Sequence, residues 1–165
     1  MKLRYNTFII AMISLHIIPV SANEEGSTMN REETNIVKTV ETMTLAFHQK
    51  NITGVLTTYE DGAVVLFEPG KKVSDPVVLK QMFEGAFQIN PWFRYPNGHE
   101  VYIANDIALH IAPWVMKGKS PDGVDIKQSG LSVAVLRKQH NGAWLLVLDN
   151  PHGQRLMEKQ PITNN

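Results

Sequence analysis

Apolar residues recur every three or four positions in the first third of the chain, which is the spacing of one face of an α-helix. This apolar stripe consists of Ile36, Val37, Val40, Met43 and Phe47. Asn30, with Glu33 three residues later, is typical of a helix N-terminus, because each side chain can bind the other residue's backbone N–H. The pattern predicts a helix that begins at Asn30 and ends near Gln49.

A second, shorter helix is predicted directly after the first. Asn51 can cap it, and its apolar residues at helical spacing are Ile52, Val55, Leu56 and Tyr59. We expect Asp61-Gly62 to end this helix and the apolar run 63–67 to form a short strand. Glu68-Pro69-Gly70 then predicts a turn.

A third helix is predicted to begin at Asp75, followed by Pro76, whose missing N–H is not needed in a first helical turn. It ends at Asn90, because a residue before proline disfavours helical backbone. From there the period of the sequence is that of strands, predicted over 92–95, 99–104, 106–116, 124–138 and 143–149. Asn141-Gly142 between the last two strands predicts a hairpin.

This order of elements indicates the α+β class, with three N-terminal helices packed on one face of a curved, mostly antiparallel sheet. Three strand segments are apolar almost without interruption, namely 63–67, 131–136 and 143–148. A sheet with one solvated face would instead alternate apolar and polar residues. Since the helices can cover only one face, we expect a second copy of the chain to cover the outer face of the sheet, forming a homodimer.

Composition narrows the class of protein. The chain has 165 residues, which favours a single domain, and 16 basic residues balance 16 acidic ones. A nucleic-acid partner is therefore not expected, because phosphate binding needs clustered excess positive charge. The chain contains no cysteine, which excludes disulfides, thiol catalysis and thiolate metal sites.

The N-terminus has the pattern of a secretory signal peptide. Lys2 and Arg4 precede an apolar run from Phe8 to Val20, and Val20-Ser21-Ala22 is a small-residue cleavage site. The run is too short to span a bilayer as a helix, so we expect no membrane anchor after cleavage. The predicted domains are a signal peptide over 1–22, a flexible lead over 23–29, a folded domain over 30–153 and a polar tail over 154–165. The mature protein is expected to be periplasmic or secreted.

Four stretches carry a resemblance to a known superfamily. They are Lys50-Asn51-Ile52 through Tyr59-Glu60-Asp61, Asp106-Ile107-Ala108-Leu109-His110 with Trp114, the hairpin 137–144 and the closing Asp149-Asn150-Pro151-His152-Gly153. In this order and spacing, residues 30–153 resemble the nuclear-transport-factor-2-like superfamily, and most of all its SnoaL-like and ketosteroid-isomerase-like branch. The resemblance implies a cone-like half barrel with one pocket, commonly in a homodimer, and leaves the chemistry open.

Glu68 is the first catalytic candidate, since it lies before a proline at the end of the first strand, where the resemblance places a carboxylate base. An acid at the mouth of an apolar pocket would have a raised pKa, as proton abstraction requires. The alternative is a solvated glutamate in a turn. Two hydrogen-bond donors that the resemblance implies are missing: Met43 stands where the isomerases have an oxyanion tyrosine, and no carboxylic acid occurs in 130–136. Steroid isomerisation is therefore not expected.

His110 and Trp114 are predicted to share one face of their strand with Ala108 and Ala112, where a ligand could lie against the indole. The alternative is a half-buried histidine that bonds to a neighbouring strand or an interface.

Asp149 is a further catalytic candidate, expected on the same face of its strand as Leu145 and Val147. A carboxylate paired with His110 could serve acid–base chemistry, whereas the alternative role is to stabilise the turn at Asn150-Pro151. Tyr59 and Trp92 complete the ligand-binding candidates, although core packing is the alternative for Trp92 and its aromatic neighbours.

The histidines show no metal-ligand spacing, so neither a metal nor another cofactor is expected. The sequence thus favours an exported homodimer that binds a small hydrophobic or amphipathic molecule. The alternative is a cofactor-free isomerase, cyclase or dehydratase with Glu68 or Asp149 as general base and His110 as its partner. A third possibility is a purely structural module whose own side chains fill the pocket.

Overall fold

The computed structural model describes residues 29–158. The predicted signal peptide (1–22), nearly all of the predicted lead and the end of the predicted tail lie outside the described residues. Within this range, no helix combines the length and the apolar character needed to cross a membrane.

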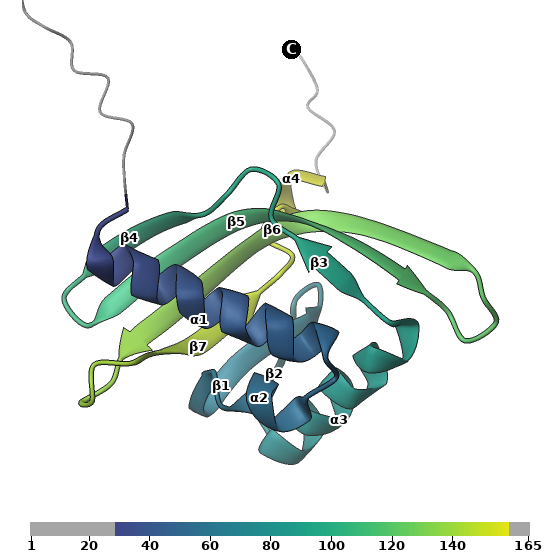
Figure 1. Cartoon of the computed structure of the whole chain (residues 1–165), viewed down its shortest axis with the longest axis horizontal. Coiled ribbons are helices and arrows are strands. Elements are labelled where there is room, and N and C mark those ends of the chain that lie inside the picture. The colour runs from purple at the N-terminus through teal and green to yellow at the C-terminus, as the bar shows by residue number, and fades with distance from the viewer. Residues whose placement is uncertain (1–28, 159–165) are drawn as a thin grey trace, which may run out of the picture.

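Helices α1 (Arg31–His48), α2 (Ile52–Leu56) and α3 (Pro76–Ala86) lie on one side of a curved, open sheet (Figure 1). The strands are β1 (Tyr59–Glu68), β2 (Lys71–Val73), β3 (Trp92–Arg94), β4 (Glu100–Ala104), β5 (Ile107–Lys119), β6 (Asp125–Lys138) and β7 (Trp144–Asn150). Their order across the sheet is β2-β1-β7-β6-β5-β3, and β4 also pairs with β5. All of these pairs are antiparallel except β1 with β7, so the predicted α+β class with a curved, mostly antiparallel sheet is confirmed.

Helix α1 begins and docks as its sequence requires. Asn30 and Glu33 form the predicted capping box, which satisfies backbone N–H groups that the first helical turn leaves free. Trp144 at the start of β7 anchors the helix to the sheet: its Nε1 donates to Glu32 Oε2 at 2.9 Å, and its carbonyl accepts from Thr39 Oγ1 at 3.0 Å. The apolar stripe of α1 therefore faces the sheet.

The second predicted helix is too long, and Tyr59 does not belong to it. Helix α2 ends at Leu56, and β1 begins at Tyr59, which pairs with Leu146 of β7. Tyr59 also lies an even number of residues before Ala63 and Val65, which is the spacing of one face of a strand. All three side chains are buried. Parallel pairing with β7 therefore overrides a pattern that is ambiguous over one helical turn.

Other differences lie at element ends. Strand β5 continues to Lys119 instead of ending at Met116, because its ladder with β6 runs on as far as the pair Lys119 and Asp125. Strand β2 was not predicted, and the chain after Ala86 forms a 3₁₀ turn, η1 (Phe87–Ile89), before Asn90. A short helix, α4 (Arg155–Glu158), follows β7.

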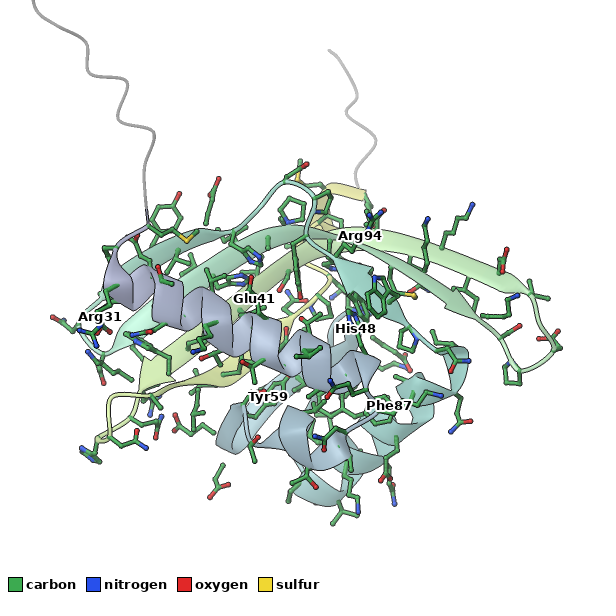
Figure 2. The ribbon with its side chains drawn as sticks, in the orientation of Figure 1. Arg31, Glu41, His48, Tyr59, Phe87 and Arg94 are labelled. Atoms are coloured by element: carbon green, nitrogen blue, oxygen red, sulfur yellow. The ribbon has the colours of Figure 1, made fainter. Side chains whose placement is uncertain are left out.

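The core fills the space between the helices and the inner face of the sheet. Phe47 of α1 is its aromatic centre, with ring centroids 4.9 Å from Phe87 and 6.0 Å from Phe83. Figure 2 labels Tyr59 and Phe87 among the side chains in this space. On β5 the residues at every second position from Ala108 to Met116 are buried, which confirms that His110 and Trp114 share the inner face.

Candidate functional site

A cavity of about 230 Å³ lies within this core, between the helices and the sheet. Its wall includes residues of α1, α3, β1, β5, β6 and β7 and is mostly apolar and aromatic. Among the predicted ligand-binding residues, Tyr59 and Trp114 line it. Met43 lines it as well, at the position where the resemblance would place a tyrosine.

Trp114 can form part of the wall because its neighbour on β6 is a glycine. A Cβ atom added at Gly130 would lie 2.7 Å from the indole ring and 2.9 Å from the Pro151 carbonyl oxygen. Nε1 of Trp114 donates a hydrogen bond of 3.0 Å to that same oxygen. The indole is therefore fixed against the β6 backbone, with its polar atom already satisfied.

Asp149 also lines the cavity, and an irregularity in β7 brings it there. Simple alternation predicted that it shares a face with Leu145 and Val147, and that prediction is wrong. The pairing with β6 shifts by one residue between Leu146 and Leu148, as a β-bulge does. Asp149 consequently points to the same side as Leu146, into the cavity.

The carboxylate of Asp149 is bound to Tyr59 across the parallel pair of strands. The Tyr59 hydroxyl donates to Asp149 Oδ2 at 2.7 Å. Burial raises the pKa of Asp149 above its ordinary value, although the bond from Tyr59 opposes this shift. Burial and the nearby negative charge likewise raise the pKa of Tyr59 well above its usual value, so its hydroxyl keeps its proton.

A second pair of hydrogen-bonded polar side chains in the wall was not among the predicted sites. Thr44 of α1 and Tyr95, which follows β3, both line the cavity, and their hydroxyls lie 3.2 Å apart. Burial raises the pKa of Tyr95 to about 12. The available signal was Thr44 itself, a polar residue one turn after Val40 and inside the apolar stripe of the first helix.

His110 is fully buried but does not line the cavity. Its Nε2 lies 2.8 Å from His99 Nδ1, while its Nδ1 has no hydrogen-bond partner among the described residues. Ala134 of β6 pairs with His110 on one side and with Asp149 on the other. Two strand spacings, about 10 Å, therefore separate the two candidates, and the predicted acid–base pair is not brought together.

Trp92 and Glu68 lie outside the cavity wall. The indole of Trp92 is 56% exposed and stacks on His48 at the end of α1, with ring centroids 4.1 Å apart. Glu68 is exposed at the end of β1 and forms an ion pair with Lys71. Asp149 is thus the sequence-predicted acid that the fold places against the cavity.

Within residues 29–158, no three histidine or carboxylate side chains come close enough to hold a metal ion together. The cavity offers hydrogen bonding at the Tyr59–Asp149 and Thr44–Tyr95 pairs, and Gln128, Ser132 and His152 are the other polar residues of its mostly apolar wall.

Comparison with known proteins identifies the fold. No family model matches the sequence, and no curated protein is significantly similar to it. Many solved structures are similar, and the three described next have identities of 11–18%, which support conclusions about the fold alone.

A ketosteroid isomerase-like protein from Shewanella frigidimarina superposes with a TM-score of 0.60 at 18% identity, covering 72% of this chain and 95% of that one. A scytalone dehydratase-like protein from Novosphingobium aromaticivorans gives 0.64 at 11%, covering 72% and 80%. A protein described as a calcium/calmodulin dependent protein kinase II association domain, from Xanthomonas campestris, gives 0.65 at 17%, covering 73% and 86%. The chain therefore has the nuclear-transport-factor-2-like fold, as its resemblance implied.

The buried histidine pair makes stability depend on pH. Burial, with a smaller contribution from His99, lowers the pKa of His110 to about 4, whereas an unfolded histidine titrates near 6.5. Below pH 6.5 the unfolded chain therefore binds more protons at this site, and acid favours unfolding until the pH reaches about 4. We expect this site to lower the free energy of unfolding by on the order of 2 kcal/mol between pH 7 and pH 5.

Urea denaturation of the wild type and His110→Asn at these two pH values measures the effect. The raised pKa of Asp149 acts in the opposite direction but is common to both proteins, so it cancels in the comparison. His140→Asn, in an exposed turn, is the matched control and should keep the wild-type pH dependence. Equal pH dependence in the wild type and His110→Asn would contradict the prediction.

Proposed function

We propose that this chain is an exported homodimer whose cavity binds a small apolar or amphipathic molecule. The observation that carries the binding function is the cavity itself, about 230 Å³ of space inside the core with a mostly apolar wall and few polar groups. Pockets of this composition are typical of small-molecule sites. A bound molecule would also restore the packing contacts that an empty cavity forfeits.

The wall that holds the ligand is built from side chains that are already fixed. Trp114, Tyr59 and Tyr95 each have their polar atom in a hydrogen bond within the protein. Such a preformed wall lowers the ordering cost of binding. The structural alternative, a pocket filled by its own side chains, is disfavoured by the open volume.

We expect the uncharged dye N-phenyl-1-naphthylamine to bind saturably, with increased fluorescence in an apolar environment. Ala86→Trp should weaken binding at least tenfold, because Ala86 of α3 lines the cavity and an indole there would fill it. Leu45→Trp is the matched control, since Leu45 is 55% exposed on α1 and should leave binding unchanged. A wild-type protein that shows no saturable fluorescence would overturn the binding function.

Export is supported by the charged start, short apolar run and small-residue cleavage site predicted over residues 1–22. Removal of Lys2 and Arg4 would change the formal net charge from zero to −2. An exported protein would then bind its ligand outside the cytoplasm.

Homodimer formation is supported by the outer face of the sheet, which the helices leave uncovered (Figure 1). Three adjacent pairs on this face are aliphatic: Leu109 with Val135, Ile111 with Val133, and Pro113 with Leu131. An apolar patch on a sheet is the kind of surface that two-fold pairing buries. The likeness to an association domain is compatible with this assembly.

We expect sedimentation at micromolar concentration to give twice the mass of one chain. Ile111→Lys should give a monomer with unchanged circular dichroism, because it places a charge in the centre of the aliphatic face on β5. Val124→Lys, at a 58% exposed position after β5, is the matched control and should remain dimeric. A monomeric wild type would exclude the outer-face dimer at that concentration.

Acid–base catalysis without a cofactor is the second candidate function, and the Asp149 carboxylate against the cavity favours it. Burial raises the pKa of Asp149, which makes it a stronger base than an ordinary aspartate, and Tyr59 holds it in position. The likenesses to isomerase-like and dehydratase-like proteins are compatible with such chemistry. Since Glu68 and His110 do not line the cavity, we assign the role of base to Asp149.

Hydrogen–deuterium exchange at C1 of 2-tetralone, followed by proton NMR in D₂O, tests this function. We expect Asp149→Asn to slow the protein-dependent exchange by about 10²-fold or more, which is the usual contribution of a general base. Glu68→Gln is run in parallel. Loss of exchange in Glu68→Gln instead of Asp149→Asn would contradict the assignment, and no exchange by the wild type would leave binding as the function.

A further inference from the structure

The cavity wall contains a carboxylic acid but, within residues 29–158, no lysine or arginine to balance it. That acid is Asp149. The other titratable groups in the wall are Tyr59, Tyr95 and His152, and both tyrosines keep their protons. A carboxylate without a fixed cation is costly at such a site, because an apolar wall does not solvate its charge.

Only one oxygen of this carboxylate has a partner in the described part of the chain. Oδ2 accepts from Tyr59, while Oδ1 accepts no hydrogen bond from residues 29–158 and is not sealed from the cavity. His152 also lines the cavity, and its electrostatic effect opposes the upward pKa shift of Asp149, but its Nε2 lies 3.1 Å from the Phe67 carbonyl oxygen and it makes no hydrogen bond to the carboxylate in the described part of the chain. An acceptor therefore remains open toward the ligand.

The rest of the wall is a continuous series of aromatic rings. From Tyr59 to Phe83, Phe47, Phe93 and Trp114, successive ring centroids are 5.6, 6.0, 5.7 and 5.5 Å apart. All five residues line the cavity. Aromatic rings attract cations through their quadrupoles, most strongly where water is excluded, so this wall adds to the attraction of Asp149 for positive charge.

We infer that the ligand of this cavity is an organic cation, namely a protonated amine attached to a compact apolar or aromatic group. The ammonium donates a hydrogen bond to Asp149 Oδ1, and the apolar group lies against the aromatic wall. The inference rests on the proposed binding function and names its ligand class. A neutral alcohol of the same shape gains the hydrogen bond without the charge attraction, and a carboxylate is repelled by Asp149.

Three probes of nearly equal size separate these cases: 2-phenylethylamine, 2-phenylethanol and phenylacetate. We expect isothermal titration calorimetry at pH 7.5 to give a Kd at least tenfold lower for the amine than for the alcohol, with no measurable binding of phenylacetate. In Asp149→Asn, the amine should lose its advantage over the alcohol. Asp61→Asn, the same carboxylate-to-amide change at an exposed position of β1 outside the cavity wall, is the matched control and should preserve the preference.

N-phenyl-1-naphthylamine binding reports whether the cavity survives each substitution, and the wild-type probe series tests the inference even where a variant does not fold. An alcohol that binds as tightly as the amine would overturn the inference and leave the binding function intact. An amine preference that persists in a folded Asp149→Asn would also overturn it. If neither the dye nor any probe binds the wild type, the proposed binding function fails and the inference fails with it.

Discussion

The hydrogen bond between Tyr59 and Asp149 is the contact on which the site depends, because it holds a buried acid in place inside an apolar core. Its two residues lie on β1 and β7, which run parallel although most of the folded chain separates them. A carboxylate placed in this core without a partner would be costly. The bond offsets part of that cost and fixes the acid beside the cavity, so the position of the polar group follows from the pairing of the first and last long strands.

The cavity stays open because the sheet and the helices contribute residues of different size. On the inner face of β5 and β6, Ala112, Ala134 and Gly130 supply little volume, whereas α1 and α3 contribute phenylalanines that contact one another edge to face. Rings held by their neighbours cannot collapse into the space left by small residues. Open volume is therefore maintained by the rigidity of its walls.

Local chemistry made the helix caps and the last hairpin predictable, whereas long-range pairing decided several element ends and the site. The capping box at Asn30 and the Asn141-Gly142 hairpin depend on neighbouring residues, and both appear as predicted. Asp149 was assigned to the wrong face because a bulge adds one residue, which no short sequence pattern reveals. Tyr59 was assigned to a helix because its spacing from Val55 and Leu56 suits a helix as well as a strand, and only the pairing with β7 decides between them. The partner of His110 could not be foreseen from sequence spacing. His99 lies next to it because β4 pairs with β5 in a register that places Val101 opposite His110.

Asp149 and His110 flank Ala134 on the inner face of the sheet, yet acid affects them in opposite ways. Burial raises the pKa of the carboxyl group and lowers that of the imidazole, since it disfavours the charged form of each. Protonation removes a charge from the cavity wall but creates one among packed strands. Acid therefore weakens any attraction of the cavity for a cation through Asp149, whereas it destabilises the sheet through His110. Because the two groups do not touch and only Asp149 lines the cavity, protonation of Asp149 acts on the cavity wall, whereas protonation of His110 acts on the packing of the sheet.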